Sequence, residues 1–216
     1  MMNKSDKKKR IRDQIVSASK IYRDNLAGKV FLYVVGEEYF EVSFQTDRFM
    51  HLTGVNSYLK AQDFYDKAKD SILTTAQFYF DSNHTYGSAK RKVKCLQILP
   101  DLTNSLVCAL KDMSTLTLTY KIGITNLNFT IGLTENLDFD GHRINDWFLP
   151  RTMRVGDKAI ENSAHAEFVD FIFSKDASIE KYNIIAFANT TQNIPSSIVP
   201  LLSNDVLDKM GVLANA

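Results

Sequence analysis

VFLYVVGEEYFEVSFQ, residues 30–45, carries the clearest structural signal in the chain. Residues 30–35 form a continuous run of β-branched, aromatic and aliphatic side chains, which predicts a strand buried on both faces. After Gly36, apolar Phe40, Val42 and Phe44 alternate with polar neighbours, which predicts a half-exposed strand. Because the connection between the two segments is short and contains glycine, we expect them to form a β-hairpin.

The residues before this hairpin predict a basic tail followed by a helix. Residues 4–12 hold six Lys or Arg side chains against one Asp. We expect residues 1–12 to form a frayed, solvated tail, with a sequence-independent phosphate contact as the alternative. From Arg10 to Leu26, apolar residues recur at spacings of three and four, and Gly28 stands where helices often end. An amphipathic helix is therefore predicted there.

After the hairpin, apolar spacing over residues 59–72 predicts a helix capped by Asn56 or Ser57. Residues 74–98 are ambiguous, although residues 81–83 are typical of a turn and residues 90–94 contain a second basic cluster. Pro100 favours the first turn of a further helix, which the apolar residues as far as Met113 extend.

The second half of the chain alternates with a period of two. Five segments separated by turn residues predict strands: 115–125, 128–134, 147–155, 167–174 and 182–189. Residues 197–210 predict a closing helix. We therefore expect an α+β fold: an N-terminal helix, a β-hairpin, two further helices, an antiparallel meander and a short C-terminal helix. Residues 13–190 form one domain in this prediction, and residues 191–216 form a helical extension.

The composition excludes several classes of protein. The chain has 216 residues, of which 44% are hydrophobic, enough for a core in one or at most two domains. Its net charge of +1 excludes a chain that is basic throughout. The two cysteines, Cys95 and Cys108, cannot build a disulfide framework or a four-cysteine zinc site, so we expect buried thiols in a reducing compartment.

No secretion signal follows the basic N-terminus. The uncharged stretch 182–203 is long enough to cross a bilayer, but its polar side chains would lack partners in lipid. We therefore expect a cytoplasmic protein with no membrane partner.

The sequence contains no familiar metal, nucleotide or acyl-transfer motif. The four histidines are scattered without metal-ligand spacing, and neither a glycine-rich phosphate loop nor a GxSxG motif occurs. We therefore expect no metal and no cofactor. The segment RFMHLTG, residues 48–54, lies between a strand and a helix, where functional sites often form. The imidazole of His51 in this segment suits proton transfer near neutral pH. The alternative interpretation of His51 is a hydrogen-bonded core histidine.

Several motifs occur in an order that resembles a known family. In chain order they are FEVSF (40–44), FMHLTGV (49–55), AQDFY (61–65), FLPRT (148–152) and FVDFIFSK (168–175). Over roughly residues 14–190 the chain resembles phage- and mobile-element-encoded nuclease-like proteins grouped with the Barnase, EndoU, colicin and RelE ribonucleases, the BECR fold. The resemblance implies helices packed on an antiparallel sheet and a metal-independent RNase or toxin-like activity in a host bacterial cell.

For such an enzyme, RNA cleavage by its own 2′-OH needs a base, an acid and cations that stabilise the developing charge. His51 is the only histidine in a matching motif, so we expect it to be the base or acid. Thr53 would orient the phosphate or imidazole, and Lys175 completes the expected catalytic set. The expected RNA ligands are Lys121, Arg151, Arg154 and Tyr182. The alternatives are solvated strand faces for the cations and core packing for Tyr182.

Two functions remain open. The first is an RNase that acts on RNA such as tRNA or mRNA. The second is a non-catalytic module of the same fold that inhibits a host or defence protein, with no assigned oligomeric state. The RNase is the leading hypothesis, while the balanced charge and the lack of a second histidine in a matching motif count toward the second function. A cleft in which His51 meets cations would favour the first, and an exposed apolar patch the second.

Overall fold

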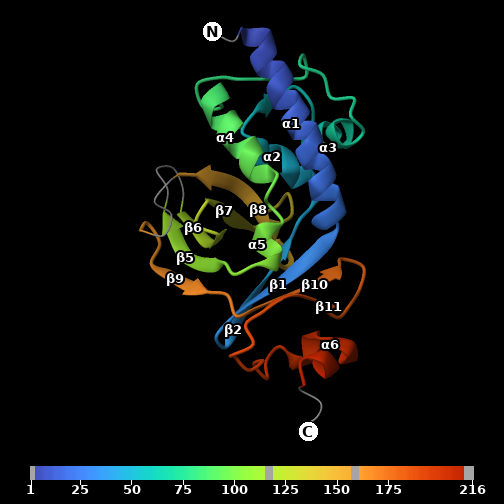
Figure 1. The fold of residues 1–216 in the computed structure, drawn as a ribbon, viewed down its shortest axis with the longest axis vertical. Coiled ribbons are helices and arrows are strands. Elements are labelled where there is room, and N and C mark those ends of the chain that lie inside the picture. Colours follow the sequence, from blue (N-terminus) through green and yellow to red (C-terminus); the bar gives the residue numbers. More distant parts are fainter. Residues whose placement is uncertain (1–2, 115–118, 157–160, 212–216) are drawn as a thin grey trace.

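In the computed structural model, which describes residues 3–114, 119–156 and 161–211, one large sheet separates two groups of helices (Figure 1). The strand order among these residues is β11-β10-β1-β2-β8-β7-β6-β5-β9. Neighbouring strands are antiparallel except β2 and β8, which are parallel. The predicted α+β class is therefore confirmed, with one parallel junction in the middle of the sheet.

The elements have the following bounds. The strands of the large sheet are β1 (Lys29–Val35), β2 (Glu38–Ser43), β5 (Cys108–Ser114), β6 (Thr119–Thr125), β7 (Phe129–Leu137), β8 (Arg143–Val155), β9 (His165–Phe168), β10 (Phe171–Asp176) and β11 (Ile184–Ala188), and β3 (Asn56–Ser57) pairs with β4 (Phe78–Tyr79). The helices are α1 (Lys4–Asn25), α2 (Phe49–Thr53), α3 (Ala61–Lys69), α4 (Tyr86–Leu96), α5 (Asp101–Asn104) and α6 (Asn204–Lys209), with 3-10 turns η1 (Thr46–Arg48) and η2 (Val199–Leu201).

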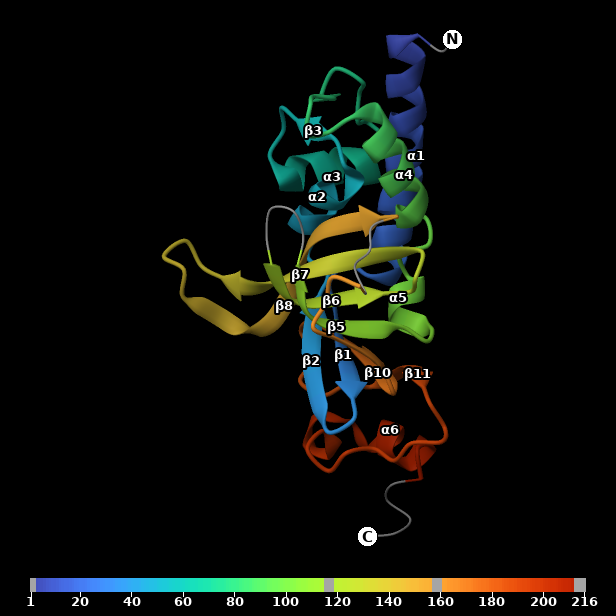
Figure 2. The ribbon, with the colours of Figure 1, turned by 90° about the vertical axis from the view of Figure 1, so that its left-hand side faces the viewer.

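The hairpin predicted from residues 30–45 is present as β1 and β2, with Val30 opposite Ser43 and Val35 opposite Glu38. Strand β1 is buried on both faces, because a separate core covers each one. Phe31, Tyr33 and Val35 belong to the first core, under the helices α1 to α4. Their neighbours Val30, Leu32 and Val34 belong to the second core, which Val206 and Leu207 of α6 cover (Figure 2). The described part of residues 191–216 is thus packed on the sheet.

The first core joins β2 to α3. Val42, Phe44, Phe64 and Ala68 are all buried in it, and Phe40 packs against it. The expected apolar face of the second strand is therefore confirmed, but the expected exposure of its other face is wrong at Ser43, which is buried. Phe44 lies edge-on to two aromatic rings, with ring centroids 6.1 Å from Tyr22 and 5.6 Å from Phe31.

Phe44→Ala is expected to lower the free energy of unfolding by about 3–5 kcal/mol, because it empties a fully enclosed aromatic site. Chemical denaturation measures this loss. Tyr39→Ala is the matched control, since Tyr39 lies on the same strand and is 44% exposed, and we expect a change of about 0.5 kcal/mol or less. Equal losses in the two variants would contradict the assigned faces of β2.

The prediction of a frayed tail over residues 1–12 is wrong for residues 4–12, which form the first turns of α1. The Asn3 side chain caps this helix by accepting the backbone N–H of Asp6. Lys8 is not free in solvent, because its Nζ donates to the carbonyl oxygens of Thr75 at 2.9 Å and Phe78 at 2.7 Å. The apolar stripe of α1 then continues to its end as predicted.

The helix predicted from Pro100 to Met113 is present only in its first turn, as α5, and the rest of that prediction is wrong. The helix stops at Asn104 because Ser105 is extended, and β5 follows. Asn56 and Ser57, predicted as helix caps, lie in β3, and α3 begins at Ala61. The ambiguous segment 74–98 contains β4 and α4. The predicted strand 115–125 is present from Thr119, while residues 115–118 lie outside the described residues.

Candidate functional site

Basic side chains line a hollow between α4 and the end of β8, with a volume of about 200 Å³. We call it the α4–β8 hollow; its lining residues are Asn83, Ser88, Arg91, Lys92, Met153, Arg154 and Val155. None of these described residues is acidic. Burial first and then the nearby Arg154 lower the pKa of Lys92. The Nε of Arg154 is buried without a hydrogen-bond partner among the described residues. The hollow therefore concentrates positive charge that an anion would neutralise.

Gly54 brings Lys92 to this place. The glycine ends α2 in the left-handed conformation, with φ of 75°. A Cβ atom on it would lie 2.7 Å from Cδ of Lys92 and 3.3 Å from Cα of Ala89. Only glycine combines this backbone conformation with so close an approach of α4. The glycine of the HLTG motif thus lets the Lys92 side chain cross the end of α2 near Arg154.

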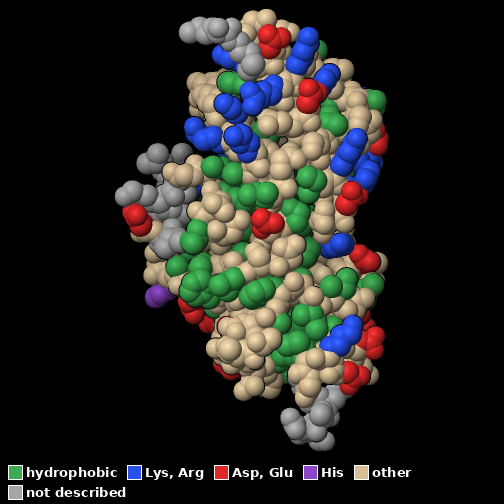
Figure 3. All heavy atoms as spheres, viewed as in Figure 1, with side chains coloured by type: hydrophobic (Ala, Val, Ile, Leu, Met, Phe, Trp, Pro, Cys, Tyr) green, Lys and Arg blue, Asp and Glu red, His purple; other side chains and the backbone are tan. Residues whose placement is uncertain are grey.

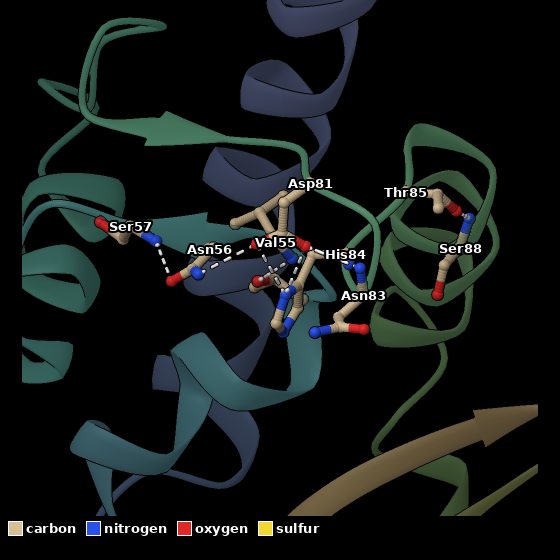
Figure 4. Close-up of polar contacts among 9 residues, drawn as sticks. Val55, Asn56, Ser57, Asp81, Asn83, His84, Thr85 and Ser88 are labelled. Carbon is tan, nitrogen blue, oxygen red and sulfur yellow. Dashed lines mark hydrogen bonds and ion pairs between the residues drawn. The ribbon is translucent and has the colours of Figure 1, made fainter.

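An aspartate–histidine pair stands beside the hollow, in the loop that leads into α4 (Figure 4). Asp81 Oδ1 lies 3.1 Å from Nδ1 of His84 and accepts the backbone N–H groups of Asn83 and His84. Asp81 Oδ2 accepts a hydrogen bond from the Asn56 amide at 3.2 Å. The Asn56 bond first, and then the His84 backbone bond, lower the pKa of Asp81 to about 2. An ionised carboxylate therefore holds the imidazole, whose Nε2 bonds to no other described residue.

His51, the histidine expected from the motif, is exposed on α2. Partial desolvation and then the positive charges of Arg151 and Arg48 lower its pKa. Arg151 is the extra residue of a bulge in β8, because Gly132 pairs with Thr152 and the next residue of β7 pairs with Pro150. Along β8, Arg151 and Arg154 are three residues apart, or about 10 Å at the usual rise of a strand.

Of the other expected site residues, Lys121 comes near this region. Lys121 and Arg151 line a second hollow of about 250 Å³ together with Glu135. Lys121 Nζ lies 3.1 Å from a Glu135 carboxylate oxygen, so its charge is already paired. Arg154 lines the α4–β8 hollow, as described above. Arg151 thus lies close enough to His51 to lower its pKa, and Arg154 lines the same hollow as Lys92.

Three expected residues lie elsewhere. Thr53 is fully buried, and its hydroxyl donates to the Met50 carbonyl at the end of α2. Tyr182 is fully buried in the second core, where its hydroxyl bonds to Glu41, so its ring is not available to a base. Lys175 Nζ lies 4.5 Å from the centroid of that ring and donates to the Glu180 carbonyl. Residues of α2 belong to the first core, so the sheet separates Tyr182 from His51.

The sequence patterns did not identify His84, Asn83, Ser88, Arg91 and Lys92 as site residues. One signal was present: an aspartate three residues before a histidine in a turn, shortly before the basic cluster at 90–94. Asp81 has this position because an Asp side chain readily accepts backbone N–H groups two and three residues later.

The net charge is only +1, but the positive charges are unevenly distributed over the surface. Lys and Arg side chains gather over the part of the molecule where the start of α1 and α4 lie (Figure 3). These two helices run side by side, with Lys7 Nζ 5.2 Å from the Tyr86 ring and Ser17 Oγ 2.9 Å from the Gln97 side chain. The basic cluster in the first turns of α1 therefore adjoins that of α4, next to the α4–β8 hollow.

One group of described residues has the spacing of metal ligands. Asp138, Asp140 and His142 are exposed at the tip of the β7–β8 hairpin, with potential ligand atoms within 4.8 Å of one another. Asp138 Oδ1 accepts the backbone N–H groups of both other residues. This arrangement is that of an ordinary turn.

The chain was compared with known proteins. The model of a family described as phage-Barnase-EndoU-ColicinE5/D-RelE like nuclease4 matches residues 14–191. This range contains the α4–β8 hollow, the Asp81–His84 pair and His51. No curated protein and no solved structure matches the chain. Within the described residues, no helix combines the length and apolarity needed to cross a membrane.

Proposed function

The chain belongs to the phage-Barnase-EndoU-ColicinE5/D-RelE like nuclease4 family, and from this premise we propose that it is a metal-independent ribonuclease of phage or mobile-element type that acts in the cytoplasm of a host bacterium. One observation carries the proposal. The α4–β8 hollow presents Arg91, Lys92 and Arg154 without a carboxylate, and its lining includes Asn83, which lies between the paired Asp81 and His84 in the same loop. Cations that hold a phosphate next to an oriented imidazole are what RNA cleavage without a metal requires.

In the proposed reaction the 2′-OH of a ribose attacks the adjacent phosphorus, and the bond from phosphorus to the 5′ oxygen breaks. Lys92 and Arg154, which both line the hollow, hold the phosphate oxygens. His51 accepts the 2′-OH proton, because its lowered pKa keeps it unprotonated at neutral pH. His84, oriented by Asp81, gives a proton to the leaving 5′ oxygen.

The other expected site residues have different places in this proposal. Arg151 is a second phosphate ligand, since it lies close enough to His51 to lower its pKa. Lys121 is a peripheral RNA contact because Glu135 already pairs with it. Thr53 shapes the end of α2 and so positions His51. Lys175 and Tyr182 take no part, because they lie on the opposite face of the sheet.

The direct test is incubation of the purified chain with total RNA and with tRNA in excess EDTA. We expect cleavage products that end in 2′,3′-cyclic phosphate, because the 2′-OH is the nucleophile. The His84→Ala protein, purified in parallel, controls for contaminating nuclease, which would be equally active in both samples. No cleavage, or cleavage that appears only when magnesium is restored, would contradict the proposal.

The pH dependence of cleavage tests His51. A base with a lowered pKa stays unprotonated to more acidic pH. The midpoint of the acidic limb of the pH–rate profile should therefore lie below about 6.5, the pKa of an ordinary imidazole. Arg151→Gln removes one of the charges that lower this pKa, so the limb should move to higher pH. Lys121→Gln is the control, since it removes a neighbouring cation that is already paired with Glu135. If the acidic limb lies at the same pH in Arg151→Gln as in the wild-type chain, His51 is not the base.

A second candidate function, a non-catalytic module that binds a host or defence protein, is supported by one feature. The β7–β8 hairpin projects from the body of the molecule (Figure 2) and carries three exposed apolar side chains. Leu137 is 42% exposed, Ile144 60%, and Phe139 is completely exposed. Contiguous exposed apolar groups are typical of protein-binding surfaces. A folded chain that fails to cleave RNA, and whose partner binding is lost in Phe139→Ser, would establish this second function.

A further inference from the structure

An exposed tyrosine and a half-buried one, Tyr58 and Tyr79, form an aromatic surface at the end of the β3–β4 ribbon. The ring centroids of Tyr58 and Tyr79 lie 4.7 Å apart, with 34° between the ring planes. Tyr58 is 73% exposed. The preceding residue in β4, Phe78, points the other way and is fully buried in the first core. We call the Tyr58–Tyr79 pair the tyrosine platform.

The platform is held in place by contacts behind it. Lys8 of α1 binds the carbonyl oxygens of Thr75 and Phe78. The Ser57 hydroxyl donates to the Gln77 carbonyl at 2.8 Å, and the backbone N–H of Tyr58 donates to the same oxygen at 3.1 Å. These bonds hold the backbone that carries both rings, so a flat ligand that stacks on the rings orders little of the chain.

The platform adjoins the proposed reaction site. Tyr79 lies opposite Asn56 in the ribbon, and the Asn56 side chain binds Asp81, which holds His84. Tyr79 is two residues from Asp81, about 7 Å along an extended chain. A nucleic-acid strand whose phosphate occupies the α4–β8 hollow therefore has a neighbouring base within reach of the platform.

We propose that the tyrosine platform stacks an unpaired nucleobase next to the cleaved phosphate, so that the substrate is single-stranded RNA. The inference rests on the proposed function. Unpaired bases offer a free aromatic face, whereas the bases of a duplex are stacked on one another and cannot reach a side chain. Polar phenol hydroxyls at the edge of the ring pair also suit a base better than an apolar peptide.

The test measures binding without cleavage, in the His84→Ala background. Fluorescence anisotropy gives the Kd for a labelled single-stranded RNA and for the same RNA annealed to its complement. Tyr58→Leu is expected to weaken single-strand binding roughly tenfold and to change duplex binding little. Tyr58→Trp keeps an aromatic face and should retain binding. Tyr39→Leu, which changes an exposed tyrosine on β2, is the matched control and should bind as the background does.

An unchanged Kd in Tyr58→Leu, or equal losses on single strand and duplex, would overturn the platform. The outcomes separate this inference from the function on which it rests. If the wild-type chain cleaves RNA and Tyr58→Leu binds and cleaves as well as wild type, the platform fails and the ribonuclease stands. If Tyr58 is needed for binding single strands that the wild-type chain never cleaves, the platform stands and the ribonuclease fails.

Discussion

His84→Ala is expected to lower the rate of RNA cleavage by about 10²–10⁴-fold, the usual contribution of a positioned acid or base. The imidazole is held by Asp81 through Nδ1, and its Nε2 bonds to no other described residue. Removal of the ring takes away a proton donor without emptying the core, since His84 is only partly buried. Single-turnover cleavage of a defined RNA measures the rate, and thermal denaturation should show a folded protein.

The chain provides a matched control for this substitution. His142 also lies near an aspartate, with its Nδ1 3.7 Å from Asp138, but at the tip of the β7–β8 hairpin. His142→Ala should cleave at the wild-type rate. His51→Ala should lose activity as His84→Ala does. Equal cleavage rates for His84→Ala and His142→Ala would contradict the assignment of His84 as the acid. If His51→Ala alone loses activity, His51 is the base and a group other than His84 is the proton donor.

Arg154→Met is expected to lower the catalytic rate by about 10²–10³-fold, as removal of one preorganised donor to a developing oxyanion does. Lys92→Met should have an effect of similar size. Both substitutions should also make the protein more resistant to heat, because two adjacent cations without a carboxylate disfavour the folded state. The lowered pKa of Lys92 has the same origin, burial and then Arg154.

Inorganic phosphate gives this prediction a second readout. An anion that binds only the folded hollow should raise the melting temperature of the wild-type chain but not of Lys92→Met. Lys94→Met is the matched control, since Lys94 lies on the same helix but is exposed. It should retain activity and the response to phosphate. A Lys92→Met protein that melts at lower temperature and still responds to phosphate would show that Lys92 is a structural residue.

The β1–β2 hairpin could be predicted because its signal is local. A buried strand, a glycine turn and an alternating strand follow one another within residues 30–45. The helix expected over 100–113 ends at Asn104, because the local pattern beyond that residue is ambiguous. Apolar residues such as Cys108 and Leu110 fit either period over so short a run, and pairing with β6 and β9 makes them a strand.

The candidate site could be predicted only in part. The HLTG motif pointed to the end of α2, where Gly54 does bring α4 close. The role of His84 depends on Asn56, which binds Asp81 from 25 residues earlier in the chain. The position of Arg154 depends on the placement of β8, far along the chain from α4. Neither the hydrogen bond between Asn56 and Asp81 nor the placement of β8 near α4 leaves a pattern in the sequence. Lys175 was misplaced because its strand lies on the far side of β1, with its side chain against Tyr182.

The parallel junction between β2 and β8 sets the order in which this protein becomes functional. The junction pairs Glu41 with Trp147 and Val42 with Phe148, across more than a hundred residues. The pairing of β1 with β10, in which Lys29 lies opposite Asp176, is also of long range. Contacts of such long range form late in folding. Trp147 is the only tryptophan of the chain, so its fluorescence should report the pairing of β2 with β8. A nascent chain that lacks β8 cannot hold a phosphate between Lys92 and Arg154, so activity begins only when synthesis has passed residue 155.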